Sequence, residues 1–196
     1  MKLLVALLFA VSVSYGQYDY KLVEDYQNNL IQFYADSTTT PLKSEELAAF
    51  TGIQFFPVNE NFYVRATFKR TKNEVPFAMK TSGKKTPMYV KYGEISFKIA
   101  NKKYKLDVFQ NLDLVRNNPK YRNHLFLPFT DLTSGVTSYG GGRYLDLTIP
   151  EKKHFWLDFN KAYNPYCAYT LGYNCPIPPA QNDLEVAIEA GVKFDN

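Results

Sequence analysis

Apolar and polar residues alternate with a period of two through the middle of the chain. This period places alternate side chains on opposite faces of an extended strand, so it predicts β structure. In residues 61–69 the apolar set is Phe62, Val64, Ala66 and Phe68. The intervening side chains are Tyr63, Arg65, Thr67 and Lys69. This segment therefore predicts a strand with one core face and one solvent face.

The same alternation predicts a β-hairpin over residues 94–109. Its apolar positions are Ile95, Phe97, Ile99, Tyr104, Leu106 and Val108. The polar pair Asn101-Lys102 predicts the turn between the two strands. Further short strands are predicted at 75–80, 87–91 and 124–129, and sixteen tyrosines and fifteen phenylalanines also favour strands. The predicted fold is mainly β, an antiparallel β-sandwich or flattened barrel.

Three segments depart from this pattern. Residues 20–34 carry apolar side chains at helical spacing, which predicts an N-terminal amphipathic helix packed on the domain. Ser44 is predicted to cap a second, short helix, and residues 184–190 are predicted to form a terminal helix capped by Asn182 or Asp183. Residues 113–123 are predicted to be a polar, basic loop. The C-terminal region is otherwise rich in coil.

The first sixteen residues have the layout of a secretory signal peptide. A short basic start is followed by an apolar run from Leu3 to Val13, and small residues precede a predicted cleavage after Gly16. The run is too short to span a bilayer, which takes about 20 residues. We therefore expect an exported protein, periplasmic or extracellular, with no membrane span after cleavage. Residues 17–196 are long enough for one domain with a single core.

The charge balance is mild, with a formal net charge of +4 at pH 7. The lysines are spread along the sequence, and we predict no face on which they gather with interleaved aromatic residues. Nucleic acid is therefore not an expected partner. The charge allows only a modest attraction to anionic ligands or surfaces.

In residues 143–149 the alternation places Arg143 on the same side as three apolar residues. A guanidinium there requires a carboxylate, because a buried unpaired charge is costly, and Asp131 or Asp158 could provide it. The alternative is that Arg143 clamps an anionic group of a ligand through its planar fork. The glycines at 140–142 predict a tight or bulged turn rather than a phosphate-binding loop.

Residues 154–160 place a row of polar and aromatic side chains opposite a core face. The row comprises His154, Trp156, Asp158 and Asn160, and it is a candidate wall of a ligand site. Tyr163, Asn164 and Tyr169 follow in a coil. They could complete a pocket for a sugar or another polar ligand, or they could hold the coil in place through bonds to nearby backbone groups.

Cys167 and Cys175 are eight residues apart and are predicted to form a disulfide in an exported protein. The closed loop is short, so the bond would stabilise the fold by about 2.5 kcal/mol. The alternative is a nucleophilic Cys167 with His124 or His154 as its base. Two cysteines and two scattered histidines match no metal-ligand spacing, so no metal site is predicted.

Three motifs in the last third carry a family resemblance. They are Phe129-Thr130-Asp131-Leu132-Thr133-Ser134-Gly135, Tyr139-Gly140-Gly141-Gly142-Arg143-Tyr144-Leu145, and the run from Asp158 to Tyr169. These match F-x-D-x-T-x-G, Y-x-x-G-R-Y-L and D-F-N-x-A-Y-N-P-x-C-A-Y. The chain thus resembles domain of unknown function family 1684, from the 20–34 helix to the C-terminus. The resemblance implies a group of mostly bacterial and archaeal proteins with no agreed activity. Val192-Lys193 departs from it, where relatives often have an acidic residue.

The sequence lacks a Gly-x-Ser-x-Gly elbow, a His-Glu-x-x-His motif, a phosphate-loop lysine and a dinucleotide fingerprint. No cofactor is therefore predicted. We expect an exported protein that binds a small polar or anionic ligand between the GGGRYL and DFNxAYNPxCAY segments. The candidate ligand-binding residues are Asp131, Arg143, Trp156, Asp158, Asn160, Tyr163 and Asn164. The alternative is a hydrolase that uses Cys167 or Asp158.

Overall fold

The computed structural model describes residues 18–194. The predicted signal peptide, at 1–16, lies outside the described residues. The helices are α1 (Tyr20–Ala35), α2 (Ser44–Ala48) and α3 (Leu112–Asn117). The strands are β1 (Tyr63–Arg70), β2 (Phe77–Ala78), β3 (Met88–Ile99), β4 (Lys102–Asn111), β5 (His124–Asp131), β6 (Arg143–Thr148), β7 (His154–Asp158) and β8 (Asp183–Leu184). Five single 3-10 turns lie at Glu60–Phe62, Pro119–Tyr121, Phe159–Lys161, Tyr166–Ala168 and Ala180–Asn182.

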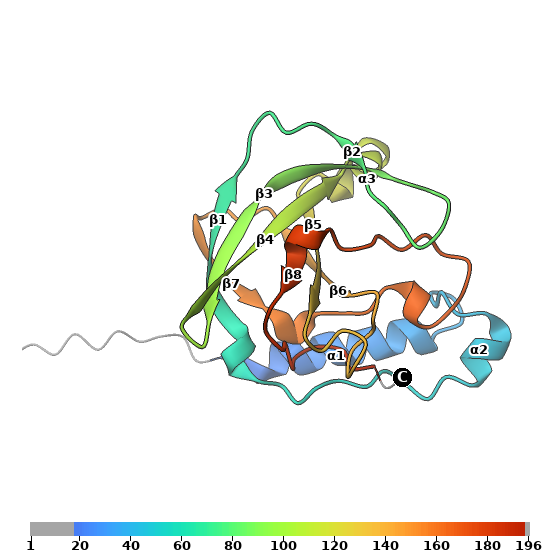
Figure 1. Ribbon diagram of the computed structural model, residues 1–196. Helices are drawn as coiled ribbons and strands as arrows, with labels where there is room; N and C mark the ends of the chain where they lie inside the picture. Colours follow the sequence, from blue (N-terminus) through green and yellow to red (C-terminus); the bar gives the residue numbers. More distant parts are fainter. Residues whose placement is uncertain (1–17, 195–196) are drawn as a thin grey trace, which may run out of the picture.

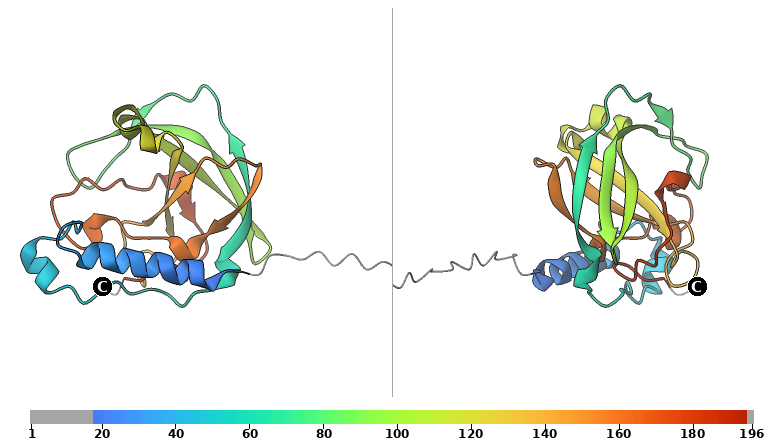
Figure 2. Two further views of the ribbon diagram at one scale, coloured as in Figure 1. Left: turned by 180° about the vertical axis from the view of Figure 1, so that it is seen from behind. Right: turned by 60° about the vertical axis from the view of Figure 1, so that its left-hand side comes forward.

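The strands form one curled, mainly antiparallel sheet, a half-barrel with α1 lying across one end (Figure 1, Figure 2). The strand order is β6-β5-β4-β3-β1-β7, with β2 added beside β3 and β8 parallel to β5. The two edge strands, β6 and β7, follow each other in the chain. A single bridge between Tyr144 and Tyr163 links the start of β6 to the coil that follows β7. The predicted mainly β, barrel-like fold is confirmed.

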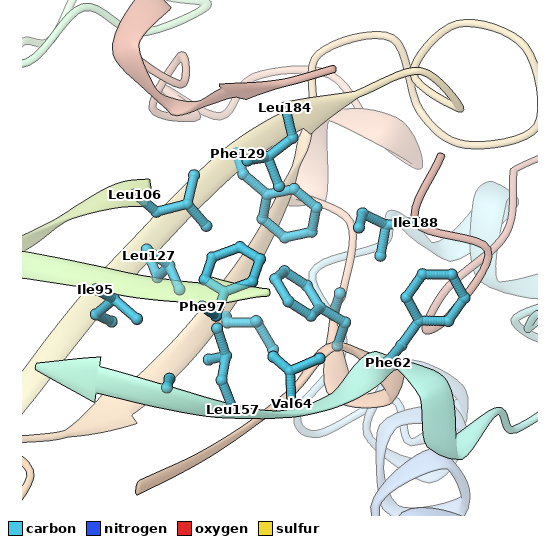
Figure 3. Close-up of a cluster of buried hydrophobic side chains, with 14 of the residues drawn as sticks. Phe62, Val64, Ile95, Phe97, Leu106, Leu127, Phe129, Leu157, Leu184 and Ile188 are labelled. Carbon is cyan, nitrogen blue, oxygen red and sulfur yellow. The ribbon is translucent and has the colours of Figure 1, made fainter. Parts of the chain in front are cut away.

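The inner face of the sheet holds the main core. The side chains labelled in Figure 3 converge from β1, β3, β4, β5 and β7 and from the C-terminal segment. The predicted alternation is confirmed here, because Val64, Ile95 and Leu106 all lie in this core. At roughly 1.5–3 kcal/mol for each large apolar side chain, this burial is the main stabilising term.

The β3–β4 hairpin is confirmed, with a turn one residue earlier than predicted. Ile99 pairs with Lys102, so Ala100 and Asn101 form the two-residue turn, and both have a positive φ. Such a turn matches the right-handed twist of the flanking strands. The predicted strand at 87–91 is the beginning of β3, which continues through a bulge next to Gly93. A Cβ at Gly93 would meet the Phe68 ring at 2.5 Å, so glycine allows β1 and β3 to approach closely.

The opposite face of the sheet is covered along β3 to β6. A second cluster there comprises Met79, Tyr89, Phe109, Phe126 and Tyr144. The covering chain consists of residues 77–88 and the coil after residue 163. These two segments are joined by backbone hydrogen bonds from Ser82 to Cys175 and from Ile177 to Lys80. The second cluster is therefore packed between the sheet and this covering chain.

The N-terminal helix is confirmed at Tyr20–Ala35, where the Asp19 side chain accepts a hydrogen bond from the Leu22 N–H. The short helix at 44–48 is also confirmed, but its cap is Lys43 rather than Ser44. The predicted loop at 113–123 is wrong, because it contains α3 and a 3-10 turn. Side chains of Asn111 and Asn118 cap these two turns, which gives a polar segment its helical starts.

The predicted terminal helix at 184–190 is wrong. After β8 the chain runs without helix, and buried side chains from the sheet bond its backbone. Asn182 does not cap a helix; its amide bonds the N–H and the carbonyl of Asp107 and the carbonyl of Pro128. These long-range contacts override the local helical preference of the segment.

Candidate functional site

A cavity of about 380 Å³ lies between the β3–β5–β6 part of the sheet and the covering coil. We call it the tyrosine cavity. Its lining is Tyr89, Leu114, Tyr121, His124, Phe126, Tyr144, Asp146, Tyr163, Pro165, Tyr166, Tyr173, Asn174, Cys175 and Pro176. The size is within the range of small-molecule sites. Residues of the GGGRYL and DFNxAYNPxCAY segments therefore share its wall.

Aromatic rings form a continuous inner surface in this cavity. Phe126 and Tyr144 meet edge to face at 4.7 Å between ring centroids, and Tyr144 meets Tyr163 at 5.8 Å. Tyr89 contacts Phe126 at 5.7 Å. Each such pair adds about 0.5–1.5 kcal/mol beyond area burial, so the wall is held in place by its own packing.

Large apolar side chains also gather around the mouth of the cavity. Leu114, Tyr121, Tyr166 and Tyr173 all line the cavity and are all exposed. Tyr166 and Tyr173 contact each other edge to face at 5.0 Å. Single exposed apolar residues are ordinary, but a group of them around one hollow is typical of a binding surface.

One carboxylate organises the polar side of the tyrosine cavity. The Asp146 side chain is 50% exposed, and its Oδ1 lies 2.9 Å from His124 Nε2. Its Oδ2 accepts a hydrogen bond of 2.8 Å from the Tyr163 hydroxyl. The strand register places these groups together, because Asp146 lies opposite Phe126 and His124 lies two residues before it on the same face.

The field of Asp146 extends across the tyrosines of the wall. Burial, followed by the charge of Asp146 and its hydrogen bond, holds the pKa of Tyr163 well above its usual value. Burial also raises the pKa of Tyr89 to about 12, and Asp146 contributes in the same direction. The pKa of Tyr166 is raised by burial, then by Tyr173 and by Asp146. Burial is the main cause of each shift, and the Asp146 carboxylate adds negative charge on this side of the cavity.

The lining combines aromatic rings with a few polar side chains. None of the described lining residues is a serine, threonine, lysine or arginine, and its cysteine is in a disulfide. A neutral His124 that donates from Nε2 to Asp146 would leave Nδ1 as an acceptor. His124 Nδ1 and the Asp146 carboxylate would then both accept hydrogen bonds, which favours a ligand that donates them.

Arg143 lies in a different place, fully buried between β5, β6 and the C-terminal segment. One of its terminal nitrogens bonds Asp131 Oδ2 at 2.8 Å and the Ile188 carbonyl at 2.7 Å, and the other bonds the Ala190 carbonyl at 2.6 Å. The Arg143–Asp131 ion pair is the structural pair expected from the sequence. With no exposed surface, the guanidinium has no free face for a ligand's anionic group.

The other predicted side chains fall into two groups. Trp156 and Asp158 line a separate hollow near the start of α1, and Arg143 is not among its lining residues. Asn160 is buried and its amide bonds both backbone groups of Asn59 at 2.9 Å, which fastens the coil before β1. Asn164 is buried and donates to the Tyr169 hydroxyl at 3.1 Å. Tyr163 is the one candidate that lines the tyrosine cavity.

The predicted disulfide is present, with 2.03 Å between the sulfurs of Cys167 and Cys175. It closes a loop that carries Tyr173 and Asn174 to the cavity mouth. A sulfur in a disulfide is not a thiolate, so Cys167 is not available as a nucleophile in this state. Asp158, the other proposed catalytic group, accepts hydrogen bonds from Asn160 and the Tyr18 hydroxyl.

Asp146 was not predicted as a site residue, and His124 was predicted only as an alternative base for Cys167. A signal was available in the alternation itself. The strand that begins at Arg143 has Tyr144, Asp146 and Thr148 on its second face, and a preceding strand has His124 and Phe126. Pairing those two segments would have brought the imidazole and the carboxylate together.

These features define a mainly β, half-barrel protein with a cavity on the outer face of its sheet. The chain belongs to the family described as "Protein of unknown function (DUF1684)", whose model matches residues 48–193. The same fold occurs in the solution NMR structure of an uncharacterized protein from Haloarcula marismortui, which is 29% identical. That match covers 89% of this chain and 94% of the archaeal chain, with a TM-score of 0.67. No curated protein matches this sequence.

Proposed function

We propose that this protein binds a small polar ligand in the tyrosine cavity, and that the ligand carries an ammonium or a similar cationic donor on a ring-shaped body. The observation that carries the proposal is an aromatic wall around one half-exposed carboxylate, with no lysine or arginine among the described lining residues. Aromatic faces attract cations, by about 0.5 kcal/mol when exposed and about 2 kcal/mol when desolvated. The Asp146 carboxylate adds an anion at the same place.

The proposed ligand carries the opposite charge to the anionic ligand that the sequence suggested. That expectation depended on Arg143 as a clamp, and the guanidinium is instead enclosed by Asp131 and backbone carbonyls. An anion in the tyrosine cavity would meet the Asp146 carboxylate without a compensating lysine or arginine.

A charge series of one shape tests the proposal. Phenethylamine, 2-phenylethanol and 3-phenylpropionate share a ring and a short chain and differ mainly in charge. We expect phenethylamine to bind at about millimolar or tighter in an NMR shift titration at neutral pH, and the anion to bind at least about tenfold more weakly. Equal affinity for all three, or preference for the anion, would contradict the proposal.

Two variants locate the site. Asp146→Asn keeps the shape and removes the charge, so the affinity for phenethylamine should fall about tenfold and approach that for 2-phenylethanol. Glu151→Gln makes the same change on an exposed loop residue outside the cavity and should leave the affinity unaltered. An equal effect of both changes would show that only net charge matters.

The proposal includes export, supported by the leader layout of residues 1–16 and by the disulfide, since disulfides persist in oxidising compartments. Intact mass of the protein recovered from its native source should show a chain that begins at Gln17. A chain that retains residues 1–16 and has free thiols would contradict export. Within residues 18–194, no helix is long and apolar enough to span a bilayer.

A further inference from the structure

The solvent face of β1, β3, β4 and β7 carries another hollow, of about 710 Å³, which is far richer in positive charge than the tyrosine cavity. We call it the basic hollow. Its lining includes Arg65, Lys98, Lys103, Lys105 and His154. The prediction that the lysines share no face is therefore wrong, because residues distant in sequence are brought together by strand pairing.

The register explains how the charges converge. Lys98 lies directly opposite Lys103, and Lys105 lies opposite Ser96 on the same face. Arg65 is on β1, which pairs with β3 on one side and with β7 on the other. Like charges directly opposite each other destabilise a sheet, by a few tenths of a kcal/mol to about 1 kcal/mol. An arrangement that opposes folding in this way is expected where a function requires it.

The cations of the basic hollow are largely uncompensated. Lys105 pairs with Glu94 at 2.7 Å, and that carboxylate also pairs with Lys91 at 3.0 Å. Among the described residues, no carboxylate forms an ion pair with Arg65, Lys98 or Lys103. The three cations are therefore free to meet anionic groups from outside.

A flat aromatic platform borders the same charges. Trp156 lies directly opposite Arg65 on β7 and is 48% exposed. Its indole stacks on the Tyr63 ring at 4.7 Å and 10°, so its orientation is fixed. Thr67 and His154 are hydrogen-bonded to each other at 3.1 Å in the lining and add polar groups. An exposed indole can pack against the face of a sugar ring, and the neighbouring cations can pair with the carboxylates of an acidic sugar.

From this geometry we propose that the basic hollow binds an acidic polysaccharide, a chain of sugar rings that carry carboxylates. The carboxylates pair with Arg65, Lys98 and Lys103, and a ring face packs on Trp156. The planar Arg65 fork suits a carboxylate in two-point contact. This surface is separate from the tyrosine cavity, so the inference does not depend on the ligand proposed for that cavity.

Titration with tetragalacturonic acid, followed by NMR shifts of the lysine and indole groups, tests the inference. Neutral maltotetraose serves as the uncharged comparison. We expect the acidic tetramer to bind, with an affinity that falls as salt is raised from 50 to 300 mM, because exposed ion pairs are screened. Maltotetraose should bind at least about tenfold more weakly, since it lacks every charge contact.

Variants separate the charges of the hollow from net charge. Lys98→Gln/Lys103→Gln should lower the affinity for the acidic tetramer about tenfold, and Trp156→Ala should lower it by a similar factor. Lys84→Gln/Lys85→Gln removes two exposed lysines elsewhere and should change it less than twofold. Each variant's thermal unfolding is recorded, and Lys98→Gln/Lys103→Gln should be no less stable than the parent.

Several outcomes overturn the inference. No binding of the acidic tetramer, or an equal loss from the Lys84/Lys85 control, would show that the hollow is not a specific site. Binding to phosphatidylglycerol vesicles, or to a single-stranded oligonucleotide, more tightly than to the tetramer would replace the sugar with a different partner. Phenethylamine affinity should be unchanged in Lys98→Gln/Lys103→Gln, which keeps this test separate from that of the tyrosine cavity.

Discussion

Replacement of Arg143 by methionine is expected to destabilise the fold strongly. The guanidinium is fully buried and paired with Asp131, which is itself buried. Methionine would leave that carboxylate without its partner, a change that costs about 3–5 kcal/mol. It would also remove donors from the carbonyls of Ile188, Ala190 and Val192. Local release of the C-terminal segment would let water reach these carbonyls, which limits this second contribution. Together the two effects should cost at least about 4 kcal/mol of unfolding free energy.

For a domain of this size, about 4 kcal/mol corresponds to a fall in Tm of roughly 8–16 °C. Urea unfolding followed by circular dichroism gives the free energy, and hydrogen exchange should show the amides of residues 188–192 opening first. Arg65→Met is the matched control, because that arginine is exposed and should change stability by less than about 0.5 kcal/mol.

A second variant tests the origin of this loss. Asp131→Leu in the Arg143→Met background removes both charges, so the double variant should lose less stability than the sum of the two single losses. Strict additivity would mean that the ion pair is not the source of the effect. A loss below about 1 kcal/mol for Arg143→Met alone would refute the structural role of the pair.

Further expectations follow from the same contacts. Ala100→Gly should stabilise the protein by about 0.5–1 kcal/mol in urea unfolding, because Ala100 has a φ of 46° in the β3–β4 turn; a loss would contradict the turn geometry. Reduction of the Cys167–Cys175 bond should lower stability by about 2.5 kcal/mol and weaken phenethylamine binding, since its loop carries Tyr173 to the tyrosine cavity. Unchanged binding after reduction would show that this loop is not part of the site. The contribution of the buried tyrosines to stability should be constant below about pH 10 and should fall above it, because the unfolded phenols ionise there while the pKa of Tyr89 is raised to about 12. Ultraviolet titration against unfolding measurements checks this. Hydrogen bonds from Lys105 and Lys91 lower the pKa of Glu94 to about 2, so its stabilisation is present above about pH 4.5 and is lost as the pH falls towards 2. The Glu94 carboxyl ¹³C shift should therefore not titrate near pH 4.5.

The strands of this fold could be predicted because their alternation is local. Phe62, Val64 and Ala66 all lie in the core as the sequence indicated. The terminal helix could not be judged locally, because its backbone is bonded by Asp131 and Arg143 from strands more than forty residues earlier. For α3 the missed signal was local, because the Asn111 side chain caps the helix that begins at the next residue.

The candidate site could be predicted only in part. The segments that form the tyrosine cavity were identified, and Tyr163 lies in its wall. The expected convergence of Arg143 with Trp156 and Asp158 did not occur, although residues of β6 and β7 line one hollow together. Arg143 is fully buried on the core side of β6, whereas Trp156 is exposed on the other face of β7. Side chains converge only when they share a face and their strands are neighbours. Asp146 and His124 meet because β5 and β6 are neighbours.

A crystal structure of the oxidised protein soaked with phenethylamine tests the proposed cation site most directly. We predict the ammonium within hydrogen-bonding distance of the Asp146 carboxylate and the ring against Tyr166 or Tyr173. A ligand bound elsewhere with the tyrosine cavity empty, or one whose ammonium points away from Asp146 into solvent, would contradict the proposal.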